Sequence, residues 1–92
     1  MAVVFLPSAL RKLTAGVDRL EVAGATVADV VAEVDRRFPG FGAAVTAADG
    51  TLAASLQVFV DGEMSAEGLL AEVGPSTEVH FLPAIAGGGT RR

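Results

Sequence analysis

The sequence predicts an α+β roll, in which one long helix covers one face of a small sheet. Three observations support this class. The chain has 92 residues, which suits a single domain with one core. Only residues 26–38 carry a continuous apolar stripe with helical spacing, whereas four shorter segments have the alternation or the β-branched composition of strands. The predicted order is strand, strand, helix, strand, a short element and a last strand.

The first two predicted strands, residues 3–6 and 18–22, form a hairpin with a long connection. The first strand is short and rich in valine, and it ends at Pro7. The second strand alternates polar and apolar side chains, which suits a strand with one face in water. Residues 8–16 between them are expected to form a loop.

The helix has clear signals at both ends. Thr26 is a good N-cap, and Asp29 three positions later gives a variant of the capping box. Pro39 and Gly40 end the helix. The apolar stripe that should face the sheet consists of Val27, Val30, Val31, Val34 and Phe38. Charged residues lie off this stripe, and we expect them to face solvent.

The second half of the chain supplies the remaining strands. Residues 56–60 form the clearest predicted strand, which an Asp-Gly turn stops. Residues 64–73 predict a short irregular or helical connection, and residues 78–82 predict the last strand. Residues 41–55 are rich in alanine and glycine and give no clear element.

Composition excludes several kinds of protein. The net charge is −4, with 11 acidic and 7 basic residues, so we expect no nucleic-acid binding, which needs a basic surface. The sequence has no cysteine, which rules out disulfides, thiolate metal sites and a cysteine nucleophile. Since His80 is the single histidine and metal sites use several such ligands, we expect no metal site and place His80 on the surface or at an interface.

The sequence also predicts neither membrane insertion nor export. No apolar run approaches the ~20 residues that a helix needs to span a bilayer. The first seven residues lack the basic start of a signal peptide. We therefore expect a cytoplasmic protein.

The end of the chain is its most informative part. The last strand runs into three glycines, Gly87 to Gly89, and Thr90, Arg91 and Arg92 follow. Glycine has no Cβ, so a Gly-Gly segment can enter a narrow channel in another protein. The alternative is a frayed terminus without a role.

Strand alternation suggests a binding surface near this end. Val58, Val60, Val79 and Phe81 fall on one set of alternating positions, which we expect to face the helix. Phe59, His80 and Leu82 then form an exposed apolar patch on the other face. The alternatives are a slipped strand register, or cover of the patch by residues 64–73.

The element order and the closing string Val-His-Phe-Leu-Pro-Ala-Ile-Ala-Gly-Gly, residues 79–88, resemble the ubiquitin-like β-grasp sulfur carriers of prokaryotes. That family includes the small subunit of molybdopterin synthase, the thiamine sulfur carrier and the cysteine-biosynthesis sulfur carrier. The similarity in element order extends over nearly the whole chain. It implies a mixed sheet of four to five strands on one main helix, with residues 1–86 as the domain and residues 87–92 as a flexible tail.

The resemblance also implies a function. An E1-like enzyme would use ATP to adenylate the carboxylate of Gly88, and a sulfur donor would convert the acyl-adenylate to a thiocarboxylate. A sulfur-accepting synthase would then take the sulfur. The chain itself would catalyse nothing and hold no cofactor. The patch of Phe59, His80 and Leu82 lies where ubiquitin-like proteins dock their activating enzymes.

The sequence departs from the family in one respect, because it continues past the second glycine of the motif. Some carriers carry such extensions and need a JAB1/MPN-type metalloprotease to expose Gly-Gly. Spacing from Pro83 favours Gly88 as the new terminus, although a cut after Gly89 stays open. Two other functions also stay open: a protein modifier joined to target lysines, and a non-covalent interaction module. Molybdopterin precursor, thiazole, activated serine and a specialised metabolite all fit as sulfur acceptors.

Overall fold

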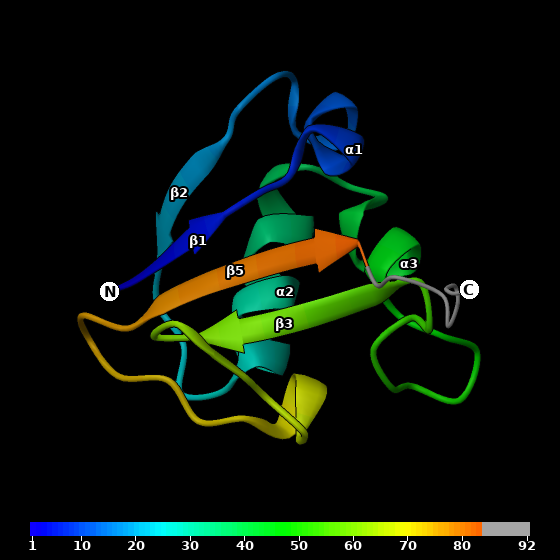
Figure 1. The fold of residues 1–92 in the computed structure, drawn as a ribbon. Helices are drawn as coiled ribbons and strands as arrows, with labels where there is room; N and C mark the ends of the chain where they lie inside the picture. The colour runs from blue at the N-terminus through cyan, green and yellow to red at the C-terminus, as the bar shows by residue number, and fades with distance from the viewer. Residues whose placement is uncertain (84–92) are drawn as a thin grey trace, which may run out of the picture.

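Five strands form one mixed sheet in the computed structural model, in which residues 1–83 are described (Figure 1). The order across the sheet is β2-β1-β5-β3-β4. The strands are β1 (Ala2–Phe5), β2 (Arg19–Val22), β3 (Leu56–Val60), β4 (Glu63–Met64) and β5 (Glu78–Pro83). The predicted α+β class with a mixed sheet on one main helix is confirmed.

The predicted hairpin and the predicted last strand both lie in this sheet. Strands β1 and β2 form the expected antiparallel hairpin, with Val4 opposite Leu20. The last strand, β5, lies in the centre, parallel to β1 and antiparallel to β3. Strands β3 and β4 are joined by Asp61 and Gly62, whose φ angles are 51° and 88°. Asp-Gly suits this two-residue turn because both positions require a positive φ.

The main helix, α2 (Val27–Arg37), has the predicted ends and the predicted buried face. The Thr26 hydroxyl accepts a hydrogen bond from the Asp29 amide at 3.2 Å, and the Asp29 carboxylate accepts one from the Thr26 amide at 3.2 Å. These two bonds complete the capping box. The four valines of the stripe are all buried in the core.

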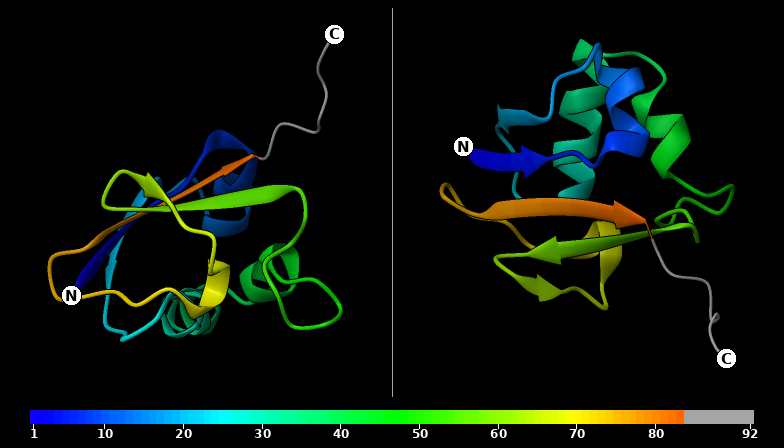
Figure 2. Two further views of the ribbon diagram at one scale, coloured as in Figure 1. Left: turned by 60° about the horizontal axis from the view of Figure 1, so that its bottom comes forward. Right: turned by 45° about the horizontal axis from the view of Figure 1, so that its top comes forward.

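A second, unpredicted helix closes the core beside α2. It is α3 (Phe41–Val45), and both of its end residues are fully buried. The ring of Phe41 meets that of Phe81 edge to face, with centroids 6.1 Å apart. Figure 2 shows α2 and α3 on the same side of the sheet, so the opposite face carries no helix in the described part of the chain.

The expected loop at residues 8–16 is wrong in its local structure. This segment contains α1 (Ser8–Arg11) and η1 (Lys12–Thr14), a short 3-10 helix. It is too short to show an apolar period. Burial of Leu10 in the core stabilises it instead, together with a local hydrogen bond from the buried Thr14 hydroxyl to the Val17 carbonyl at 2.8 Å.

The other connection is closer to its prediction. Residues 64–73 contain the short 3-10 helix η2 (Gly68–Leu70), which follows β4. Its next residue is tied to the start of α2, because the Val27 amide donates to the Ala71 carbonyl at 2.9 Å. The predicted boundary between the domain and the tail, at residues 86 and 87, lies outside the described residues.

Candidate functional site: the outer face of the sheet

The candidate site begins at the C-terminal end of β5, which is also the end of the described residues. Val79 and Phe81 point inward and are fully buried, which fixes the strand against the helices. The strand pairs on both sides, and its last residue, Pro83, lies opposite Leu56 at the start of β3. The described part of the chain therefore ends on a central strand, whose position is held by the two neighbouring strands β1 and β3 (Figure 1).

The predicted reactive residues follow β5 in the sequence. Gly87, Gly88 and Gly89 lie outside the described residues, so their role stays a prediction. The structure describes the strand that precedes them in the sequence and the face of the sheet that the helices do not cover.

Alternation along β3 and β5 sends the predicted patch to this outer face. Phe59 lies opposite His80, and Val58 lies opposite Phe81, in the antiparallel pairing of the two strands. Leu82 is 40% exposed, and Phe59 and His80 are half-buried. The register is therefore the one that the alternation predicted, and not the slipped one. The role of these three residues in binding stays a prediction.

The inner positions also follow the alternation. Val58 is 1% exposed, Val79 and Phe81 are fully buried, and Val60 is half-buried against the core. Residues 64–73 do not cover the patch as a lid. Only Met64 reaches it, as the register partner of Phe59 on β4, and Met64 itself is 59% exposed.

The structure adds two residues that the sequence reasoning missed. The ring of Phe5 stacks on that of His80, with centroids 4.3 Å apart and planes 7° apart. On its other side, the guanidinium of Arg19 lies over Phe5, 5.8 Å from the ring centroid. The alternation of β1 could have identified Phe5, since it is outward when Val4 is inward. The β1–β2 hairpin places Arg19 opposite Phe5, but only the parallel pairing of β1 with β5, which a sequence does not reveal, places both beside His80.

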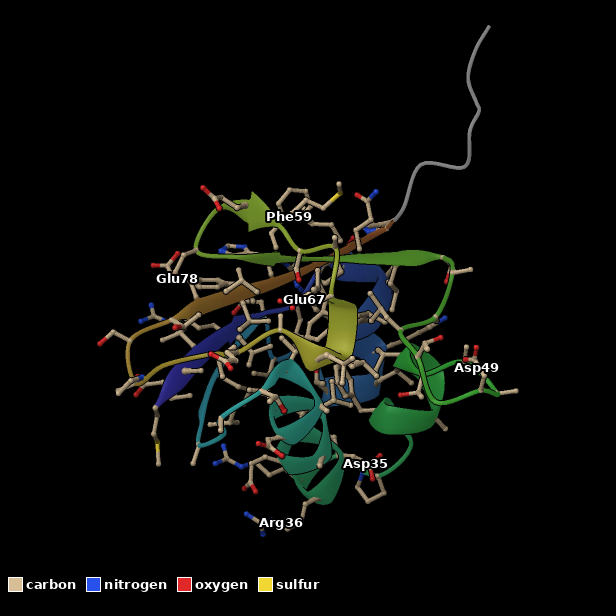
Figure 3. All side chains as sticks on the ribbon, turned by 90° about the horizontal axis from the view of Figure 1, so that it is seen from below. Asp35, Arg36, Asp49, Phe59, Glu67 and Glu78 are labelled. Atoms are coloured by element: carbon tan, nitrogen blue, oxygen red, sulfur yellow. The ribbon has the colours of Figure 1, made fainter. Side chains whose placement is uncertain are left out.

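Register partners now form one line across the whole sheet, with one residue from each strand. We call this line the transverse row: it consists of Met64, Phe59, His80, Phe5 and Arg19. Four of these side chains are apolar or aromatic, and the cation–π contact of Arg19 closes the row at one edge. Such a continuous strip on an uncovered sheet face is typical of a protein-binding surface. Figure 3 shows Phe59 on this face.

A hollow lies beside the part of the row formed by His80, Phe5 and Arg19, and it extends to Leu82 near the C-terminal end of β5. This hollow of about 330 Å³ is lined by Phe5, His80 and Leu82 and by the basic side chains Arg11 and Arg19. The Arg11 Nε donates to the Leu6 carbonyl at 3.0 Å, which fixes that side chain. Asp18 also lines the hollow, so the charge there is mixed.

The polar groups around His80 are few. Its Nε2 lies 3.5 Å from a carboxylate oxygen of Glu78 on the same strand. Among residues 1–83, no group of three or more His, Asp or Glu side chains is arranged to hold a metal ion. None of the helices described is long and apolar enough to cross a membrane.

Comparison with known proteins agrees with this architecture. The model of the ThiS family matches residues 4–88. A chain from the crystal structure of the Amycolatopsis orientalis BexX/CysO complex is 34% identical, with a TM-score of 0.84, over 96% of this chain and 100% of that one. A comparison with curated proteins gave no match.

Two further structures extend the similarity. Mycobacterium tuberculosis CysO is 22% identical with a TM-score of 0.85, over 92% of this chain and 100% of that one. At this identity the similarity shows a shared fold only. The small archaeal modifier protein SAMP1 of Haloferax volcanii is 27% identical with a TM-score of 0.70, over 95% of this chain and 98% of that one.

Proposed function

The chain belongs to the ThiS family of β-grasp sulfur carriers, and from this premise we propose that Gly88 carries sulfur as a C-terminal thiocarboxylate. One observation supports this assignment above the others: the family match extends to residue 88 and leaves out the last four residues. The motif that the family shares thus ends at the second glycine after Ala86, where the reactive carboxyl is expected.

The proposed chemistry has two activation steps. The Gly88 carboxylate attacks the α-phosphorus of ATP on an E1-like enzyme, and pyrophosphate leaves. A sulfur nucleophile at the oxidation level of sulfide then attacks the acyl carbon, and AMP leaves with the bonding electrons. The product is a thiocarboxylate, which is a nucleophile that needs no cysteine, in agreement with a chain that has none.

The transverse row is the proposed docking surface for the activating enzyme. It is wide, because it spans five strands, and it is fixed, because every member belongs to a paired strand. Its central residue, His80, lies on β5, the strand that precedes Gly88 in the sequence, so docking there would direct the chain end into the enzyme. A sulfur-accepting synthase would meet the same end of the molecule in the later step.

Release of the carboxylate requires a cut. The peptide bond after Gly88 joins it to Gly89, and an amide cannot be adenylated in place of a carboxylate. We therefore propose that a metalloprotease of the JAB1/MPN type removes residues 89–92. Loss of two arginines with this segment would change the net charge from −4 to −6.

A second function has specific support. The similarity to SAMP1, whose name describes a small archaeal modifier protein, favours conjugation of Gly88 to lysines of target proteins. Adenylation serves both outcomes, because the acyl-adenylate accepts either a sulfur nucleophile or, through later steps, an amine. A non-covalent interaction module is the third reading, and it would leave Gly88 without a role.

The decisive experiment is an intact-mass measurement on the protein from its host, with Gly88→Ala as the matched variant. We expect loss of Gly-Thr-Arg-Arg and replacement of one oxygen by sulfur in part of the population. Gly88→Ala should abolish the thiocarboxylate, since a channel shaped for glycine excludes a Cβ, and it should leave the thermal unfolding midpoint unchanged.

The other outcomes separate the alternatives. High-mass conjugates that disappear in Gly88→Ala would favour the modifier. A full-length, unmodified mass under sulfur demand would refute both covalent functions and favour the interaction module.

A further inference from the structure

A second surface lies on the helix side of the sheet, beside the edge formed by β3 and β4. An open hollow of about 430 Å³ is lined there by β3, by Met64 and the residues up to Leu70, and by the turn at residues 49–52. We call it the η2 hollow. Its volume is in the range that proteins use to receive a ligand or the side chain of a partner. Figure 2 shows η2 below β3, on the side that also holds α3.

The walls of the η2 hollow leave large apolar side chains in solvent. Leu70 is 77% exposed although its neighbours Leu69 and Ala71 are buried, and Met64 is 59% exposed. Half-buried Leu52 continues the apolar lining from the opposite wall. Exposed apolar side chains that converge on a hollow indicate binding, unlike single ones scattered over a surface.

Local hydrogen bonds hold the walls in place. The Asp49 carboxylate accepts from the Thr51 amide at 3.1 Å and from its hydroxyl at 2.6 Å, which fixes the turn. The Ser65 hydroxyl accepts from the Glu67 amide at 3.1 Å, which fixes the approach to η2. The wall that contains η2 also approaches the turn at residues 49–52. A Cβ added to Gly68 would lie 3.6 Å from the Leu52 Cβ, which is van der Waals distance.

Carboxylates surround this apolar lining. Asp49 and Glu67, both labelled in Figure 3, line the hollow. Glu63 and Glu72 line the adjoining surface, which shares Met64 and Leu70 with it. The sequence has no lysine or arginine between residues 38 and 83. The hydrogen bond from the Thr51 hydroxyl holds the pKa of Asp49 below its ordinary value, so this carboxylate is charged at neutral pH.

We propose that the η2 hollow docks a segment of a partner protein in which one large apolar side chain is flanked by lysine or arginine. The apolar walls would receive the anchor, and the carboxylates around them would attract the flanking cations. An acidic segment or a nucleic acid would be repelled by the same charges. This surface differs from the transverse row, which it meets only at Met64, and its binding does not depend on the chemistry of Gly88.

The test is an NMR titration of the ¹⁵N-labelled full-length chain with the synthetic peptide Lys-Arg-Leu-Arg-Lys. We expect shifts at the amides of residues 49–52 and 63–70. A peptide with serine in place of leucine should bind about tenfold more weakly, which corresponds to loss of the apolar anchor. Raising the salt concentration should weaken binding, because the flanking contacts are exposed ion pairs.

Substitutions locate the site. Leu70→Asn should weaken binding of the leucine peptide about tenfold, and Glu67→Gln about threefold. Glu21→Gln on β2 is the matched control, since it removes the same charge from an exposed residue at the opposite edge of the sheet, and it should leave the affinity unchanged. Each of the three side chains that are replaced is exposed to solvent, so the variants should retain the fold.

Several results would overturn the proposal. These are no shift at peptide concentrations up to about 2 mM, equal binding of an acidic Glu-Glu-Leu-Glu-Glu peptide, shifts confined to the transverse row, or unchanged affinity in Leu70→Asn.

Replacing Arg91 and Arg92 by serine tests whether the chain's own end occupies the η2 hollow. Shifts at the hollow in that variant without peptide would assign it to the chain's own end and refute a partner. No ATP or activating enzyme is present, so these results are independent of whether Gly88 carries sulfur.

Discussion

The two faces of the sheet come from the same five strands, yet they carry different chemistry. The inner face is sealed by α2 and α3, and its central side chains Val4, Val58, Val79 and Phe81 are at most 1% exposed. The outer face has no such cover, and its side chains Phe5, Phe59, His80 and Leu82 are half-buried or exposed. Alternation along each strand separates the two sets, so stability and recognition can be changed independently.

The largest effect should come from the inner face. Phe81→Ala removes a fully buried ring that contacts Phe41, and it leaves a cavity between β5 and α3. We expect a loss of about 3–5 kcal/mol in the free energy of unfolding, measured by urea denaturation. The neighbouring Leu82→Ala is the matched control on the outer face, and it should cost no more than about 0.5 kcal/mol. Equal losses for the two would contradict the division between the faces.

The next effect concerns binding and the outer face. Phe59→Asp places a charge within the transverse row, between Met64 and His80, where an enzyme that docks there would have to desolvate it. We expect at least about a tenfold weaker Kd for the activating enzyme, measured by calorimetry, with little change in the unfolding midpoint. Ser76→Asp adds the same charge in an exposed turn away from the row and should leave the Kd unchanged. Equal affinity of the Phe59→Asp protein would refute the docking surface.

Sequence reasoning predicted the sheet and α2 because both rest on periodic patterns. The valines of α2 and the alternation in β3 and β5 repeat often enough to fix which side chains are buried. The capping box was also evident, since Thr26 and Asp29 stand at its required spacing. The three residues proposed for the patch could therefore be assigned to one face before the structure was known.

The missed elements are those that only tertiary contacts stabilise. Helix α3 has five residues, follows Gly40 at a φ of 105°, and contains a glycine. Neither an apolar periodicity nor helix propensity therefore predicts it. It forms because Phe41 and Val45 are buried beneath the sheet. In the same way, Phe5 and its hairpin partner Arg19 join the transverse row only because β1 pairs with β5, two strands that lie at opposite ends of the sequence.

A smaller effect should come from the N-terminal capping box of α2, the helix that covers the inner face of the sheet. Thr26→Ala removes the acceptor for the Asp29 amide at the start of α2. We expect a loss of about 1 kcal/mol in the free energy of unfolding. Thr26→Ser keeps the hydroxyl and should recover most of this stability. Since the cap lies away from the outer face, neither variant should change the Kd for the activating enzyme, and a change would show that the two faces are coupled through α2.

The smallest effect concerns the solvent side of α2. The hydrogen bond from Arg36, with the charges of Arg36 and Arg37, holds the pKa of Glu33 below its ordinary value. A depressed pKa stabilises the fold above the unfolded-state pKa, and this contribution is lost as the pH falls through the folded-state value. An NMR titration of the Glu33 carboxyl should therefore give a lower midpoint in the folded chain than in the urea-unfolded chain. Arg36→Gln should raise the folded midpoint, and an unchanged midpoint would mean that this surface ion pair does not persist in solution. Because the pair is exposed, its contribution to stability should be small beside that of Phe81, which again assigns stability to the buried side of each element.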